Sequence, residues 1–406
     1  MRKARNIIFV AIIALCMLSV LGYRAGVQLL PDTISSTESS YLEGRTYTEF
    51  PLATEEAVAA GEFQSGFESY VSDHVPQRDS VMLVNAKAQR EAIRVASKMF
   101  GYDVYPTYYG SDYLFCDKYQ AVVDRPLAKN EMSFEKATKV VKRCTRLTRK
   151  FKDKKFVYYF CDRSSTSAAS PAHGLYSSVA DYEYFRQNFL NLFPAGVKVV
   201  DGAYTDSDEF FEDHFTTDHH WQVQGAVKAY RAICEELGKE PVEFDGFECV
   251  YPGPFYGSSA RAGLCAEGNG SWIDDVVYDH SILKVTVGGI PVPDSYLDEG
   301  FGWYANNFEP SSAYASVYAQ WFHAPDKLTV ITNDSVKSGS LLLIGDSFTN
   351  NMERFFAENY HTVYKIDPRY FNGKASRFIK KNNIDDVVCM FNETLFDNNA
   401  TRRALR

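Results

Sequence analysis

The sequence contains few cysteines and histidines for its length and no excess of positive charge. Of 406 residues, 8 are Cys and 8 are His, and 52 acidic residues outnumber 43 basic ones. This cysteine content excludes a disulfide-dense scaffold, and no C-x-x-C pair or zinc spacing occurs. The formal charge of −9 argues against a basic nucleic-acid-binding surface. We therefore expect no nucleic-acid partner, no metal centre and no cofactor.

A long uncharged run, residues 7–23, lies close to the N-terminus. It follows a cluster of three basic residues, Arg2, Lys3 and Arg5. As a helix the run would span roughly 25 Å, close to the hydrocarbon thickness of a membrane. A small-x-small cleavage site is hard to find at its end, so we predict a single-pass signal anchor over residues 1–24. A tether over residues 25–54 would follow, with the bulk of the chain outside the cytoplasm. The alternatives are a cleaved secretory signal and a buried helix, and the latter is weak because the run lacks a polar face.

Export would also permit disulfide bonds among the cysteines. Cys249 and Cys265 lie close together in a loop-rich segment and are the best candidates for a pair. Cys161 and Cys389 end apolar runs, so we expect them to be buried thiols.

Beyond the tether, short apolar runs alternate with segments of helical periodicity. Runs typical of buried strands occupy residues 154–161, 197–201, 340–345, 362–366 and 385–391. Helical segments occupy residues 55–99, 133–152, 182–192 and 222–237. This alternation predicts an α/β fold in which helices cover both faces of a parallel sheet.

Residues 239–336 interrupt the alternation. They are rich in Gly, Pro and Tyr and contain short alternating runs such as residues 281–287. We interpret them as a β-rich insertion that divides the α/β domain into residues 55–238 and residues 337–406.

Ser347 directly follows one of the apolar runs, in the segment Gly345-Asp346-Ser347. A Ser between a strand and a helix lies at the carboxyl edge of a parallel sheet, where open α/β proteins bind their ligands. The start of a helix also favours the negative charge of a developing oxyanion. The alternative is a helix N-cap or a phosphate-binding turn, and three residues alone do not exclude it.

A second polar cluster, Asp218-His219-His220-Trp221, precedes a predicted helix. A nucleophilic Ser needs a base, and the base needs a group that fixes its tautomer. Asp218 and His220, two residues apart on a turn, can place a carboxylate beside an imidazole, whereas His219 would point elsewhere. We therefore predict Ser347 as nucleophile, His220 as base and Asp218 as its orienting group. A metal site made by Asp218, His219 and His220 is the alternative.

Together these parts resemble an SGNH-type hydrolase, and the tetrapeptide at residues 218–221 is the signature of the DHHW family. That family is similar to the alginate O-acetylation proteins, which share Asp-x-His-Trp followed much later by a catalytic Ser. The resemblance extends to residues 61–78, 110–115 and 345–371, and is weakest across residues 239–336. In ordinary SGNH enzymes the Ser comes first. The reversed order here therefore resembles the alginate-acetylation branch, which looks like a circular permutation.

The resemblance implies a three-layer α/β/α domain and further residues for the site. In SGNH order, the segments after the last two strands hold the Gly and Asn blocks. This would place Asn392 as an oxyanion donor, with Arg369 and Gly373 lining the same pocket as oxyanion or substrate-binding candidates. The alternatives are that Asn392 caps the following turn and that Arg369 pairs with a surface carboxylate.

The residues and the resemblance predict a membrane-anchored acyltransferase or esterase with a serine nucleophile, acting outside the cytoplasm. The resemblance makes the O-acetyl groups of a cell-surface polysaccharide the expected substrate. It also implies a membrane-bound O-acyltransferase as partner, because an exported domain cannot reach cytoplasmic acetyl-CoA. Two other hypotheses compete: an inactive SGNH-like domain that binds glycan or organises an export complex, and a metal-dependent hydrolase.

Overall fold

The computed structural model describes most of the chain beyond its first 38 residues. The described residues are 39–43, 45–128, 130–131, 133–176, 182–267, 270–278, 282–292, 314, 317–318, 327–396 and 398–406. The predicted anchor, residues 1–24, lies outside them. Within the described part, no helix has the length and apolar character needed to cross a membrane. The chain divides into two units, Met1–Ala92 and Ile93–Arg406.

The described part of the first unit is mainly helical. It contains β1 (Ser39–Ser40), β2 (Arg45–Thr46), α2 (Glu55–Ala59), α3 (Glu62–Asp73) and the first part of α4 (Arg78–Met99). The helical spacing noted across residues 55–99 is therefore confirmed. At the end of α3, Asp73 accepts two hydrogen bonds from the Arg45 guanidinium, at 2.7 and 2.8 Å, and one from the Thr48 N–H. These bonds tie β2 to α3 within this unit.

The second unit is built on an eight-stranded sheet with the order β11-β10-β12-β14-β13-β15-β6-β7. Its strands are β6 (Lys155–Cys161), β7 (Lys198–Gly202), β10 (Leu283–Val287), β11 (Ile290–Pro291), β12 (Thr329–Asn333), β13 (Ser340–Ile344), β14 (Thr362–Ile366) and β15 (Asp386–Phe391). The five predicted strands form its parallel part, β14 to β7, and β12, β10 and β11 extend it in antiparallel pairing. The expected mixed α/β fold with a largely parallel sheet is confirmed.

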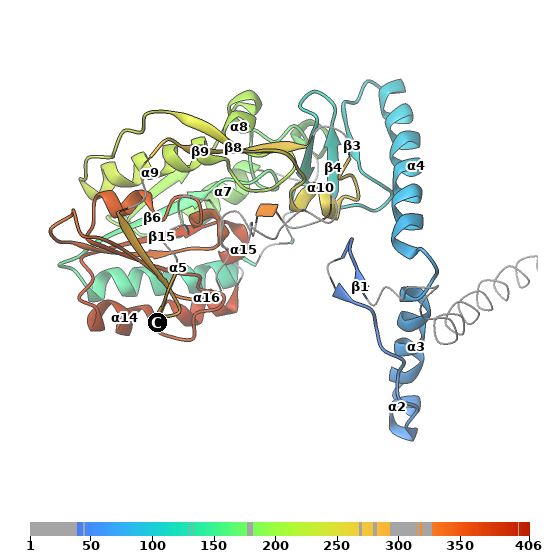
Figure 1. Ribbon diagram of the computed structural model, residues 1–406, viewed down its shortest axis with the longest axis horizontal. Coiled ribbons are helices and arrows are strands. Elements are labelled where there is room, and N and C mark those ends of the chain that lie inside the picture. Colours follow the sequence, from blue (N-terminus) through green and yellow to red (C-terminus); the bar gives the residue numbers. More distant parts are fainter. Residues whose placement is uncertain are drawn as a thin grey trace, which may run out of the picture. The chain divides into compact units, whose positions relative to one another are not determined.

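Helices cover both faces of this sheet, as the alternating side chains of the central strands require (Figure 1). In β6, Phe156 and Phe160 join an apolar cluster with α5 (Phe134–Lys150), α14 (Ala375–Lys381) and α15 (Glu393–Phe396), whereas Val157 and Tyr159 join a second cluster with α9 (Val223–Leu237). Each fully buried large apolar side chain stabilises the fold by about 2 kcal/mol. The two clusters therefore hold the sheet as the middle of three layers.

The second unit contains the three predicted helical segments as α5, α7 and α9, together with further short helices. They are α5 (Phe134–Lys150), α6 (His173–Tyr176), α7 (Tyr182–Leu190), α8 (Ser207–Asp213), α9 (Val223–Leu237), α14 (Ala375–Lys381), α15 (Glu393–Phe396) and α16 (Asn399–Ala404). Ser133 is the N-cap of α5 and accepts a hydrogen bond from the Lys136 N–H at 3.3 Å. Gly238 ends α9 with φ 64°, a conformation that glycine adopts without strain.

Residues 239–336 contribute to the main sheet as well as to a smaller one. Their other elements are β8 (Phe247–Phe255), α10 (Ser258–Ala262) and β9 (Ser271–Val276), and β8 pairs with β9 alone. A three-stranded sheet of β3 (Val104–Pro106), β4 (Tyr113–Cys116) and β5 (Ala121–Asp124) completes the unit. Because β10, β11 and β12 pair into the eight-stranded sheet, the described part of this segment is integrated with the α/β domain. The domain boundaries that we drew from the sequence remain a prediction.

The prediction of a disulfide bond between Cys249 and Cys265 is wrong. Cys249 and Cys265 form no disulfide bond, and neither do the other cysteines among the described residues. Cys249 lies exposed in β8, whereas Cys265 is buried with its Sγ 3.5 Å from the carbonyl oxygen of Ala260. Cys161 and Cys389 are buried, as predicted, within the two faces of the sheet.

Candidate active site

The Asp-His-His-Trp segment lies on a closed loop between α8 and α9. His214 and Trp221 form an antiparallel bridge at the base of the loop, and the Phe215 N–H donates to the His220 carbonyl at 3.1 Å. The Trp221 indole N–H donates to the Phe348 carbonyl at 3.1 Å. The loop is thereby joined to the segment that carries Ser347, although more than a hundred residues separate the two.

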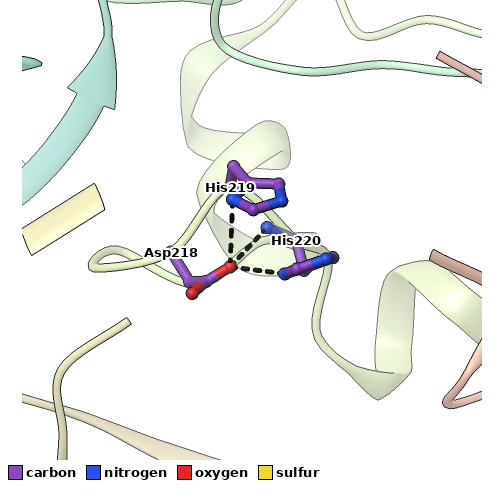
Figure 2. A group of neighbouring side chains, drawn as sticks. All are labelled: Asp218, His219 and His220. Carbon is purple, nitrogen blue, oxygen red and sulfur yellow. Dashed lines mark hydrogen bonds and ion pairs between the residues drawn. The ribbon is translucent and has the colours of Figure 1, made fainter. Parts of the chain in front are cut away.

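His220 lies between Asp218 and Ser347. Its Nε2 is 2.6 Å from Ser347 Oγ, and its Nδ1 is 2.5 Å from Asp218 Oδ1. The backbone N–H of His220 also donates to Asp218 Oδ1, at 3.0 Å, as drawn in Figure 2. The side chains of Asp218 and His220 are 1% and 6% exposed. The structure thus brings together the three residues predicted from the sequence in the order carboxylate, imidazole, hydroxyl.

Ser347 follows β13 at the carboxyl edge of the parallel strands, as predicted. The regular helix expected after it does not form. Two short 3₁₀ helices, η1 (Ser347–Thr349) and η2 (Phe355–Glu358), stand there instead. The Asp346 carbonyl accepts from the Thr349 N–H and from its hydroxyl, which closes a tight i→i+3 turn. A three-residue turn has little macrodipole, so that expected source of oxyanion stabilisation is weak.

Asp218 is held as a carboxylate by donors on both oxygens. The Ser258 N–H donates to its Oδ2 at 2.5 Å, at the start of α10. Burial opposes ionisation, but His220 and His219 beside the carboxylate outweigh it and keep the pKa of Asp218 well below its ordinary value. Gly257 makes this contact possible, because a Cβ there would overlap the Asp218 side chain and the Thr217 carbonyl.

Tyr318 fixes the plane of the His220 ring. The two rings stack with centroids 3.9 Å apart and an angle of 5° between their planes. The Tyr318 hydroxyl donates to the backbone carbonyl of Ser347 at 3.1 Å. Burial above all raises the pKa of Tyr318 well above its ordinary value, so the phenol stays protonated and able to donate. Sequence reasoning missed both Ser258 and Tyr318, which come from the segment interpreted as an insertion.

His219 faces away from the nucleophile. Its Nδ1 is 2.7 Å from Ser258 Oγ and 3.5 Å from Asp218 Oδ1. Burial, followed by the electrostatic effects of His220 and Arg163, holds the pKa of His219 well below its ordinary value. A neutral His219 therefore serves as a neighbour of the Asp218 carboxylate, with its ring directed to α10.

Asp218, His219 and His220 also satisfy the simplest geometric requirement for a metal site. One ligand atom from each lies within 4.8 Å of the others, and Figure 2 shows the Asp218 carboxylate facing both rings. However, a cation on Asp218 Oδ1 and His220 Nδ1 would displace the hydrogen bond that these atoms share. The observed bonding of both His220 nitrogens favours the hydroxyl-activating arrangement.

The predicted oxyanion candidates occupy three different environments. The Asn392 amide donates to Asp346 Oδ2 at 2.6 Å, and its Oδ1 accepts from the Thr394 N–H at 2.9 Å. Asn392 thus caps the turn after β15, as its alternative reading held, while touching the residue before Ser347. Arg369 pairs with the buried carboxylate of Asp367, its Nε 3.0 Å from Oδ1. Gly373 lies in an exposed turn against the ring of Phe371.

His214, at the base of the loop, gives the site a measurable pH dependence of stability. It is buried against Phe210, and burial lowers the pKa of His214 to about 4. In the unfolded chain the imidazole has its ordinary pKa of about 6.5, so it binds a proton once the pH falls below that value. The stabilising contribution is therefore complete above about pH 6.5 and is lost as the pH falls toward 4.

We expect the free energy of unfolding to fall between pH 7 and pH 5 by about 2 kcal/mol more in the wild type than in His214→Phe. Denaturant titrations at the two pH values measure both differences. The variant keeps the ring packing but cannot titrate. Equal losses in the two proteins would contradict this role for His214.

Comparisons with known proteins support this fold. The family model of DHHW proteins matches residues 203–366, which include Asp218, His220 and Ser347. The resemblance to the DHHW family predicted from the sequence is confirmed. No curated protein sequence matches the chain.

Two solved proteins have a similar fold. A DHHW family protein from Eubacterium siraeum DSM 15702 aligns with a TM-score of 0.56 and 17% identity, over 72% of this chain and 94% of that one. Bacillus cereus PatB1 aligns with a TM-score of 0.55 and 19% identity, over 70% of this chain and 97% of that one. A structure of PatB1 with a sulfonyl adduct aligns with a TM-score of 0.55 and 18% identity, over 71% of this chain and 96% of that one. Over about 70% of its length this chain therefore has a fold known from these proteins.

Proposed function

We propose that this chain is an acyltransferase or esterase that acts through Ser347, His220 and Asp218 on the O-acetyl groups of a cell-surface polysaccharide. The observation that carries the proposal is the unbroken line of hydrogen bonds from Asp218 through His220 to Ser347. It lies at the carboxyl edge of a largely parallel sheet, where α/β enzymes hold their ligands. The match to the DHHW family and the similarity of fold to PatB1 support the choice of class.

In the proposed reaction, Ser347 Oγ attacks the acyl carbonyl and its proton passes to His220 Nε2. Asp218 accepts from the opposite nitrogen and stabilises the imidazolium that forms. His220 then protonates the departing alkoxide, which leaves an acyl group on Ser347. A sugar hydroxyl or a water, deprotonated by His220, removes that group in the second half of the reaction. Tyr318 holds the ring in the plane that both transfers need.

The Asp346 carboxylate accepts hydrogen bonds from two groups near Ser347 that could otherwise donate to the oxyanion. It accepts from the Phe348 N–H at 3.1 Å and from the Asn392 amide at 2.6 Å. In this conformation both groups are directed to Asp346. We therefore propose that substrate binding shifts this carboxylate, so that one of the two donors faces the oxyanion. A structure with a sulfonyl group on Ser347 would test this: an unmoved Asp346 with both bonds intact would contradict it.

Covalent labelling tests the proposed nucleophile. PatB1 has been solved with a sulfonyl adduct, which makes a sulfonyl fluoride a suitable probe. We expect phenylmethylsulfonyl fluoride to modify the wild type on the peptide that contains Ser347, and to leave Ser347→Ala unmodified, as read by mass spectrometry. Prior treatment with EDTA should change nothing. Absence of a label would favour an inactive glycan-binding domain, and loss of esterase activity after chelation would favour a metal-dependent hydrolase.

The membrane-anchored, extracytoplasmic location remains a proposal from residues 1–24, and the membrane-bound acyltransferase partner remains a proposal from the family resemblance. Protease treatment of intact cells would test the location. An exported chain is digested, whereas a cytoplasmic chain is protected.

A further inference from the structure

A cavity of about 450 Å³, lined mainly by charged and polar residues, opens at the carboxyl ends of β5, β6 and β15. Its size falls in the range that binds a small ligand or a sugar unit. Six charged residues line it: Asp112, Asp124, Arg125, Glu131, Arg163 and Glu393. Tyr113, Leu127, Ser165, Thr394 and Asn398 complete its lining. Such a surface offers many hydrogen-bond partners and one aromatic face.

This cavity lies at the end of a strand that neighbours the strand of Ser347. Glu393 follows Asn392, whose amide binds Asp346, the residue before Ser347. β15, which leads to Glu393, is the direct neighbour of β13, which leads to Ser347. Arg163 follows β6, the next strand in the sheet. Its positive charge contributes to lowering the pKa of His219. A group bound in the cavity would therefore lie on the same edge of the sheet as Ser347.

The charges in the cavity are unequal, with four carboxylates against two guanidiniums. Arg163 lies 3.1 Å from Glu393 and 3.3 Å from Asp124, so one cation serves two carboxylates. Arg125 is shared in the same way by Asp112, at 2.9 Å, and Glu131, at 2.7 Å. Each cluster thus keeps an excess negative charge, which would repel an anionic ligand.

One carboxylate oxygen of a lining residue has no hydrogen-bond partner among the described residues. The Glu393 side chain is 5% exposed, and its Oε1 accepts from the Ser165 hydroxyl at 2.8 Å. Its Oε2 makes no hydrogen bond with any described residue. A buried carboxylate oxygen without a donor is costly, and a ligand hydroxyl or amine could supply the missing hydrogen bond after a small rotation of the side chain.

We propose that this cavity binds the acceptor sugar of the acyl transfer, and that it takes a neutral or amino-bearing hexose and rejects a uronate. The proposal rests on the proposed function of Ser347 for the identity of the reaction. Hydroxyl and ammonium groups would donate to the carboxylates, and the guanidiniums would donate to ring and hydroxyl oxygens. The acceptor polymer would then differ in charge from alginate, a polyuronate, although the family resemblance points to alginate acetylation.

Binding of three trisaccharides to the full-length protein tests the charge preference. The probes are the trimers of glucosamine, N-acetylglucosamine and galacturonic acid, which are cationic, neutral and anionic. Calorimetric titration should show the first two binding at least tenfold more tightly than the third. Tightest binding of the galacturonic acid trimer, or no binding of any trimer, would overturn the proposal.

A charge reversal in the cavity and a matched reversal elsewhere locate the site. Asp112→Lys changes an exposed lining residue, so the fold should survive, and thermal unfolding checks this. Asp153→Lys makes the same change in charge in the turn before β6, at the amino end of the strand, where the Asp153 side chain is 79% exposed. We expect Asp112→Lys to weaken binding of the glucosamine trimer about tenfold and Asp153→Lys to leave it unchanged. Equal effects would contradict the location, and Asp112→Asn should give an intermediate loss.

The two proposals can fail separately. Labelling of Ser347 by a sulfonyl fluoride without binding of any trimer would refute the cavity proposal alone. Trimer binding that Asp112→Lys weakens, in a protein whose Ser347 is never labelled, would refute the catalytic proposal and leave a glycan-binding site.

Discussion

Ser347→Ala should lower kcat/KM for p-nitrophenyl acetate by roughly a thousandfold or more, because a triad loses most of its rate when one member is removed. Ser347 Oγ is the atom 2.6 Å from His220 Nε2, and alanine leaves no atom to attack the carbonyl. His220→Ala should cost a similar factor, since no other base faces the hydroxyl in the described structure. Because the two side chains act in one step, the double variant should be little worse than either single one.

His219 provides the matched control for this prediction. It is also a histidine beside Asp218, but its Nδ1 bonds to Ser258 Oγ. His219→Ala should therefore lower kcat/KM by far less than His220→Ala. Steady-state hydrolysis with all four variants measures the contrast. Full activity in Ser347→Ala, or equal damage from the two histidine substitutions, would show that the assigned roles are wrong.

Asp218→Asn should lower the same kcat/KM by roughly 10³- to 10⁴-fold, because both carboxylate oxygens accept hydrogen bonds. Oδ1 accepts from the His220 backbone N–H at 3.0 Å and faces His220 Nδ1, and Oδ2 accepts from the Ser258 N–H. An Asn side chain must turn its NH₂ toward one of these donors. It then either favours the wrong His220 tautomer or loses the anchor to α10.

Ser258→Ala separates orientation from packing at this position. It removes the hydroxyl that His219 contacts but keeps the backbone N–H that binds Asp218, so its cost should be far below that of Asp218→Asn. Thermal unfolding of both variants checks that they are folded. Near wild-type hydrolysis by a folded Asp218→Asn would contradict the proposed role of the carboxylate.

The sequence by itself determined the parts of this protein whose signals are local. The five apolar runs became the parallel strands β6, β7, β13, β14 and β15, because buried parallel strands read as continuous apolar segments. Parallel strands share one carboxyl edge, so the place of Ser347 followed from its position after β13. The pairing of Asp218 with His220 was also predictable, because two residues on a turn can contact each other with little help from the rest of the fold.

Only the tertiary structure decided which distant groups complete the site. Ser258 and Tyr318 reach Asp218 and His220 from a segment without helix or strand periodicity typical of the α/β domain. The hydrogen-bond partner of Asn392 could not be predicted either. The packing of the two strand ends directs its amide to Asp346 instead of to an oxyanion. Contacts of this kind depend on loop paths and side-chain rotamers set by the packed whole, and a linear pattern carries no record of them.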